Sequence, residues 1–212
     1  MRTSVASFSL IIALASAQAV ASTTDVTLTG TLTPSACTPS LSNGGVIDYG
    51  RLSIDDLESP PIPAYQLPTK HIDMAIQCAA PTTFALINSD NRVESLPPTD
   101  TPQPGRFGLG KHQGEPVGYM HIQATSAMAD GTSSRPIHSS DGGQTWTRYD
   151  GTFWRSQASP DARVAFGTIP DGPAAAQNLT TTLQIIGRVQ KALDYSSDVQ
   201  IDGSTTFEIR YL

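Results

Sequence analysis

The sequence predicts an all-β sandwich. Short stretches in which apolar and polar residues alternate with a period of two recur along most of its 212 residues, as expected of strands that bury one face. Its 17 glycines and 16 prolines separate these stretches in the manner of turn residues. Residues 189–195 carry only a weak helical rhythm, so no helix is counted among the expected elements.

Eight or nine strands are expected, each bounded by turn residues. In the stretch 72–78 the alternation places Cys78 on the inward face. Two proline-rich stretches, 59–68 and 96–105, are expected to be surface loops, because proline cannot donate to a strand ladder; domain boundaries are the alternative reading of both. The expected strands are 26–32, 46–50, 72–78, 84–87, 118–124, 163–166, 183–189, 199–201 and 206–212.

The charge of the chain excludes a role in nucleic-acid binding. Charged residues make up only 15% of the sequence, and 13 basic residues face 19 acidic ones, which gives a net charge of −6. Proteins that bind nucleic acid neutralise phosphates with clustered Lys and Arg. No such cationic surface can be assembled here.

The first residues resemble a signal for export. Arg2 precedes a short apolar stretch, 8–14, and small residues follow it, which is the order of a secretory signal peptide. A membrane anchor is the alternative, but the apolar stretch is shorter than the roughly 20 residues that cross a bilayer. We therefore expect a signal peptide at 1–21 with cleavage after Ala21, and cleavage after Ala17 remains open.

The expected export would place the two cysteines, Cys37 and Cys78, in an oxidising compartment. An oxidising compartment favours one disulfide between them over two separate buried thiols. The four histidines show no metal-ligand spacing with each other or with the cysteines. We expect no metal and no cofactor.

The last strand carries the strongest functional signal. Phe207, Ile209 and Tyr211 alternate toward one side of a strand that is expected to run to residue 212. A long apolar edge of this kind promotes aggregation unless a partner covers it. The stretch 26–32 alternates in the same way and is the second expected pairing surface.

Four features together resemble the subunits of bacterial chaperone–usher fimbriae, in particular a group of fimbrial-type proteins of undefined role. The spacing in Gly-Thr-Leu-Thr-Pro-Ser-Ala-Cys, residues 30–37, is one of them, and the second cysteine about forty residues later is another. The others are Asp-Asn-Arg at 90–92 and a terminal Thr-Phe-Glu-Ile-Arg-Tyr-Leu in which Tyr211 is penultimate. The resemblance covers nearly all of the chain that follows the expected signal peptide.

The resemblance implies an incomplete immunoglobulin-like β-sandwich of the pilin type, at 31–212, that lacks its own last strand. An N-terminal donor-strand extension at 22–30 would complete the neighbouring subunit by β-strand addition. The implied partners are a periplasmic chaperone, an outer-membrane usher and neighbouring pilus subunits, and the implied location is a fimbrium at the cell surface. The donor side chains would be Val26 and Leu28, with Gly30 at the close-fitting end, and Phe207, Ile209 and Tyr211 would line the groove and face the chaperone.

The implied function is that of a structural subunit and not of an enzyme. The alternative is a self-complete secreted β-sandwich that binds carbohydrate, in which 26–32 pairs within its own sheet. A turn motif, Ser139-x-Asp141-x-Gly143-x-Thr145-Trp146, resembles the Asp-box of sialidase propellers, where it shapes a hairpin and takes no part in catalysis. In the carbohydrate-binding alternative, a surface glycan would stack on Trp146, Tyr149 and Trp154.

Overall fold

The computed structural model describes residues 24, 26–30, 36–169 and 171–212. The chain divides into two units, 1–33 and 34–212. The predicted signal peptide lies outside the described residues. The boundaries expected at 21 and 30 stay predictions.

Within the N-terminal unit, residues 26–30 have no regular secondary structure. The side chains of Val26 and Leu28 are 94% and 97% exposed. The strand expected at 26–32 is therefore absent over 26–30, and residues 31–32 lie outside the described part. An alternating sequence forms a strand only when a neighbouring backbone supplies the ladder hydrogen bonds.

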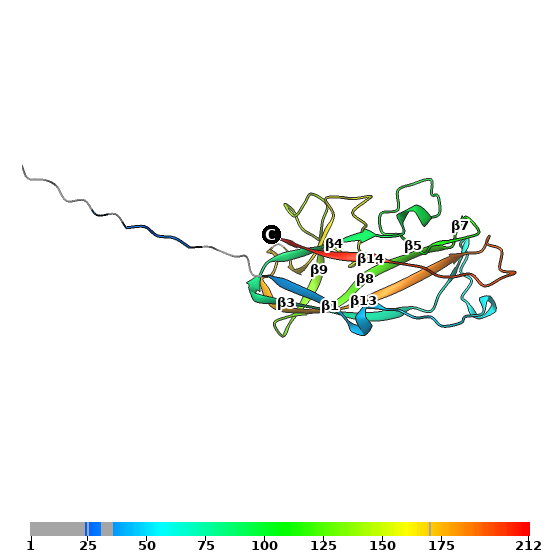
Figure 1. The fold of residues 1–212 in the computed structure, drawn as a ribbon, viewed down its shortest axis with the longest axis horizontal. Helices are drawn as coiled ribbons and strands as arrows, with labels where there is room; N and C mark the ends of the chain where they lie inside the picture. The colour runs from blue at the N-terminus through cyan, green and yellow to red at the C-terminus, as the bar shows by residue number, and fades with distance from the viewer. Residues whose placement is uncertain (1–23, 25, 31–35, 170) are drawn as a thin grey trace, which may run out of the picture. The chain divides into compact units, whose positions relative to one another are not determined.

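The unit 34–212 is built from β-strands, with three short 3-10 turns and no α-helix among its described residues. Eight strands form one continuous path in the order β1-β3-β13-β8-β9-β11-β4-β14 (Figure 1). Their bounds are β1 (Cys37–Leu41), β3 (Lys70–Thr82), β4 (Phe84–Asp90), β8 (Gly118–Ala129), β9 (Thr132–Ser139), β11 (Arg163–Thr168), β13 (Ala176–Gln190) and β14 (Thr205–Tyr211).

Six shorter strands extend this framework. β2, β5, β10 and β12 pair with β13, β8, β9 and β11 respectively, and β6 pairs with β7 in a separate ladder. Their bounds, with those of the 3-10 turns, are β2 (Ala64–Gln66), β5 (Phe107–Gly108), β6 (Lys111–His112), β7 (Glu115–Pro116), β10 (Thr147–Arg148), β12 (Gly172–Pro173), η1 (Ser42–Gly45), η2 (Ile54–Asp56) and η3 (Val93–Ser95). In the described part of the chain, no helix is long and apolar enough to cross a membrane.

The path folds into two packed layers, which confirms the all-β sandwich. β1, β3, β13 and β8 form one layer, and β9, β11, β4 and β14 form the other. The β8–β9 hairpin joins them through Asp130 and Gly131, whose φ angles of 48° and 79° suit a two-residue turn. One core cluster includes Ile76 and Leu183 from the first layer and Leu86 and Phe166 from the second. The path thus closes like a barrel except along the seam between its two end strands, β1 and β14.

Sequence alternation accounts for the long strands. Along β3, the inward Ile72, Met74, Ile76 and Cys78 are buried, as expected. The disulfide between Cys37 and Cys78 is also confirmed, and it joins β1 to β3 at paired positions whose Cα atoms are 3.9 Å apart. It fixes the edge strand β1 to the rest of its layer.

Three elements differ from the sequence-based expectation. Residues 46–50 and 199–201 alternate like strands but have no regular secondary structure, because no neighbouring strand pairs with them in the described part of the unit. The loop expected at 59–68 contains the short strand β2.

The pattern of alternation also fails to predict β1, which contains Pro39, and β9. Pro136 interrupts its alternation, yet it lies in the strand opposite Phe166 of β11. Proline removes one ladder donor, so a stretch that contains it is not expected to form a strand.

We expect loss of the disulfide to destabilise the fold substantially. Replacing both cysteines by alanine frees a loop of 41 residues, which lowers the free energy of unfolding by about 4 kcal/mol in the chain-entropy account. Urea unfolding of the oxidised protein and of the double alanine variant measures the difference. A loss below about 1 kcal/mol would show that β1 is held mainly by its ladder to β3.

Candidate functional site: the open seam between β1 and β14

The seam is bounded by two strands that each pair on one side only. Among the described residues of 34–212, β1 pairs only with β3, and β14 pairs only with β4. β14 runs antiparallel to β4 from Thr205 to Tyr211, so its other backbone edge faces the seam. Alternate N–H and C=O groups along such an edge remain available to a further strand.

A groove of about 930 Å³ opens along the seam. Its apolar lining comes from the inner face of the first layer and from the segments on either side of the seam. The first layer contributes Ile72, Met120, Ile122, Leu183, Ile185 and Val189, and the flanking segments contribute Leu41, Ile47, Tyr49, Ile54, Leu57, Val199, Ile201 and Phe207. The groove therefore gives access to the core of the sandwich itself.

Of the three residues predicted to line the groove, two point toward the core and the third lies largely at the surface. Phe207 and Ile209 are partly buried against the core cluster, and the ring of Phe207 meets that of Phe153 edge-on at 5.1 Å. Tyr211 is 48% exposed. Of the three, Phe207 lines the groove.

Tyr211 connects the two sides of the seam at one point. The backbone N–H of Cys37 in β1 donates a hydrogen bond to the Tyr211 hydroxyl, with 2.9 Å between nitrogen and oxygen. A side chain thus satisfies a β1 edge donor that a neighbouring strand would otherwise pair. This contact lies next to the disulfide.

Two segments without secondary structure form the walls of the groove beyond these strands. On the β1 side the chain turns at η1, where Asn43 and Gly44 adopt φ angles of 51° and 60°. It then continues through 46–53 without a strand partner. On the β14 side the wall is 195–204. These walls contain both alternating stretches that sequence analysis expected to be strands.

The charges at the groove are few and exposed. Arg51 and Asp198, one from each wall, form an ion pair with 3.3 Å between guanidinium nitrogen and carboxylate oxygen. Both side chains are largely in solvent, where ion pairs add little stability. The pair crosses the seam without holding it closed.

The Asp-Asn-Arg loop at 90–92 secures the start of β14. Arg92 donates two hydrogen bonds to the carboxylate of Asp202, at 2.8 and 2.9 Å, and this contact lowers the pKa of Asp202. The Asn91 side chain donates to the hydroxyls of Ser204 and Thr206. In the sequence, this loop is notable only for its resemblance to fimbrial subunits, because its hydrogen-bond partners lie more than a hundred residues away.

The Asp-box motif forms a tight loop between β9 and β10, which confirms the predicted hairpin. The Asp141 carboxylate accepts hydrogen bonds from the Ser139 and Thr145 hydroxyls and from the backbone N–H groups of Gln144 and Thr145. These bonds hold the pKa of Asp141 well below its usual range. The Trp146 indole N–H donates to the carbonyl of Gly143. All of these contacts shape the loop itself.

The structure separates the three aromatic residues that were predicted to stack on a glycan. Tyr149 and Trp154 meet around the ring of His138, with centroids 4.6 and 4.4 Å from it. Trp146 packs instead against Ile137 and two alanines of the outer face of the second layer. Because Ile137 and His138 are successive residues of one strand, their side chains lie on opposite faces. A single platform of all three rings does not form.

The described residues contain no group of three or more His, Cys, Asp or Glu side chains that could hold a metal ion. The seam between β1 and β14 is suited to strand pairing and side-chain packing. It offers an open backbone edge, apolar side chains beneath it and few charges around it.

These features define a disulfide-linked, all-β sandwich with one open seam. Residues 26–131, half of the chain, match the model of a family described as protein of unknown function (DUF1120). The chain belongs to this family.

Two proteins of Escherichia coli (strain K12) are similar over most of their length. Protein GltF is 28% identical over 239 aligned residues, which cover 96% of this chain and 94% of GltF. A protein described as uncharacterized protein YhcF is 26% identical over 218 residues, which cover 86% of this chain and 87% of YhcF. The similarity thus extends beyond β8 and β9 into the segments that form the seam.

The buried ring of His138 predicts a pH dependence of stability. His138 is 4% exposed, and burial lowers its pKa, with a smaller opposing effect from Asp150. Below the ordinary pKa of about 6.5 the unfolded chain binds a proton that the folded chain does not. Stability should therefore fall as the pH drops from about 7 toward the lowered pKa, and less so in His138→Phe, as urea unfolding at several pH values would measure.

Burial also lowers the pKa of His121, so part of the dependence should remain in that variant. His71 is exposed, and His71→Phe serves as the matched control that keeps the original dependence. An equal pH dependence in His138→Phe and in the unchanged protein would contradict the assignment.

Proposed function

We propose that this protein is a structural subunit of a surface fimbria, in which a strand from a neighbouring chain fills the seam between β1 and β14. The observation that carries the proposal is the seam itself. It has a free backbone edge along seven residues of β14, and an apolar groove lies beside that edge. A soluble sandwich with such an edge needs a cover.

The two irregular walls indicate what kind of segment could occupy the seam. Residues 46–50 and 199–201 have the alternation of strands, but no strand in the described part of the chain pairs with them. An added strand between them would supply ladder hydrogen bonds to both walls while its alternate side chains enter the groove. This is β-strand addition, in which backbone bonds give affinity and side-chain pockets give specificity.

The proposed donor is the stretch 22–30 of another copy or of a related subunit. Val26 and Leu28 are spaced two residues apart, so in an extended strand both side chains point to the same face. Both are apolar and exposed, and they match the apolar lining of the groove. Gly30 follows at the same spacing, where the absence of a side chain allows close backbone approach.

The remaining parts of the proposal concern assembly and location. Export through a signal peptide at 1–21, protection of Phe207, Ile209 and Tyr211 by a periplasmic chaperone, and delivery through an outer-membrane usher are supported by the resemblance to chaperone–usher subunits. The chaperone would occupy the seam until the neighbouring subunit replaces it. The proposed role needs no catalysis.

A peptide of residues 22–32 tests the donor role. We expect this peptide to raise the melting temperature of a chain that begins at residue 31. At a peptide concentration of about 100 times Kd, binding adds about 2.7 kcal/mol, which corresponds to roughly 5–10 °C for a domain of this size. Differential scanning calorimetry measures the shift. No shift at saturating peptide would refute the donor role.

Matched controls separate groove binding from unspecific effects. A peptide carrying Val26→Asp and Leu28→Asp should give no shift. In the domain, Phe207→Thr should weaken the response because Phe207 lines the groove, whereas Arg210→Thr should leave it unchanged because the Arg210 side chain lies on the opposite face of β14. Native mass spectrometry of the chain from residue 22 then distinguishes donation between chains, which gives oligomers, from pairing within one chain, which gives monomers only.

A further inference from the structure

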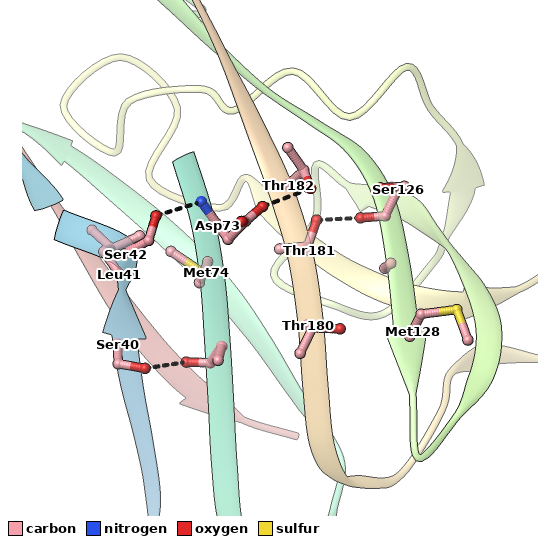
Figure 2. Close-up of a pocket in the computed structure, with 12 residues that line it drawn as sticks. Ser40, Leu41, Ser42, Asp73, Met74, Ser126, Met128, Thr180, Thr181 and Thr182 are labelled. Carbon is pink, nitrogen blue, oxygen red and sulfur yellow. Dashed lines mark hydrogen bonds between the residues drawn. The ribbon is translucent and has the colours of Figure 1, made fainter. Parts of the chain in front are cut away.

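A second hollow, of about 600 Å³, lies over β1, β3, β13 and β8. Figure 2 shows polar side chains from these four neighbouring strands gathered around it. The inward residues of β3, such as Ile72 and Met74, belong to the core, so the side chains of Asp73 and Ala75 lie on the opposite, outer face. The hollow is therefore formed mainly on the face that turns away from the groove.

Hydroxyl groups and one carboxylate line the hollow. The polar members of the lining are Ser40, Ser42, Asp73, Ser126, Thr180, Thr181 and Thr182. Thr182 donates its hydroxyl proton to Oδ1 of Asp73 at 2.9 Å, and the backbone N–H of Asp73 donates to the Ser42 hydroxyl at 3.0 Å (Figure 2). The first bond holds the carboxylate against β13, and the second fixes the backbone of Asp73 against η1.

Several polar atoms around the hollow have no protein partner. Within the described part of the chain, Oδ2 of Asp73 and the hydroxyls of Ser126 and Thr180 make no hydrogen bond. Each hydroxyl can both donate and accept, and the carboxylate oxygen can accept. The hollow thus presents an acceptor and two adaptable groups on one surface.

The charge and the apolar part of the lining narrow the class of ligand. No Lys, Arg or His lines the hollow, so nothing there would balance a phosphate or a carboxylate. Met128 lines it as well, and its side chain is 44% exposed, which offers an apolar surface beside the polar groups. A sugar ring has the matching character, with hydroxyls at its rim and C–H groups on its faces, and the volume lies within the usual range of ligand sites.

We infer that this hollow is a binding site for a neutral saccharide. Asp73 accepts a sugar hydroxyl, Thr180 and Ser126 exchange hydrogen bonds with its neighbours, and Met128 packs against the ring. The site lies on the outer face of the first layer, so a strand in the groove leaves it open. It does not depend on strand complementation, and it differs from the aromatic residues Trp146, Tyr149 and Trp154.

An NMR titration of the protein from residue 22 tests this site. Neutral disaccharides, namely maltose, lactose and cellobiose, are added separately at millimolar concentration, and backbone amide shifts are followed. We expect at least one of them to move the amides of Asp73, Ser126 and Thr180 in a saturable way. No saturable shift with any of the three, or shifts confined to Tyr149 and Trp154, would overturn the site.

Variants locate the contacts. Asp73→Asn removes the charged acceptor and should weaken binding roughly 10- to 100-fold, and Thr180→Val removes one hydroxyl while keeping the shape of the strand and should weaken it about 3- to 10-fold. Asp171→Asn is the matched control, because Asp171 is also an exposed carboxylate that accepts from a threonine hydroxyl, that of Thr168, but lies in the other layer. Unchanged affinity in both hollow variants would also overturn the proposal. Donor-peptide binding is measured separately, so the saccharide site and the donor-strand role can each be refuted independently of the other.

Discussion

Among the described residues no strand lies between β1 and β14, and this opening governs the rest of the structure. Every other junction along the path from β1 to β14 is joined by backbone pairing, over several residues in most cases and at Val164 and Leu86 alone between β11 and β4. At the seam, the two backbone edges and the core beneath them are open to solvent. An unpaired backbone edge beside apolar side chains is unfavourable in water and favourable as a place for another strand. The disulfide and the Arg92–Asp202 contact hold the two sides of this opening in position without closing it.

Six of the eight strands on the path from β1 to β14 could be predicted from the sequence, because burial on one face imposes a period of two that is visible without knowledge of partners. β3, β8 and β13 follow that pattern over many residues. The failures have one physical cause each. Among the described residues, 46–50 and 199–201 have the right pattern but no partner to complete a ladder. β1 and β9 have partners but imperfect patterns, because they contain Pro39 and Pro136.

The candidate site was predictable in part. The inward spacing of Phe207, Ile209 and Tyr211 could be predicted from the chain alone, since strand geometry dictates it. Other features depend on contacts between distant residues, such as the hydrogen bond from Cys37 to Tyr211 and the contact of Arg92 with Asp202. The aromatic residues show the same limit. Proximity in sequence suggested one patch, yet alternation along β9 sends their packing partners to opposite faces.

The pairing of β14 with β4 has a consequence for how the chain folds. Phe207 lies opposite Asn88, so this ladder joins residues separated by more than half of the polypeptide. Contacts of such long range form slowly, because much chain entropy is lost before they add stability. During synthesis β14 emerges well after β4, whose edge toward β14 stays unpaired until then. The folding chain is therefore most prone to aggregation in the interval before β14 docks onto β4, and a protein that binds the open edge of β4 would protect it best at that stage.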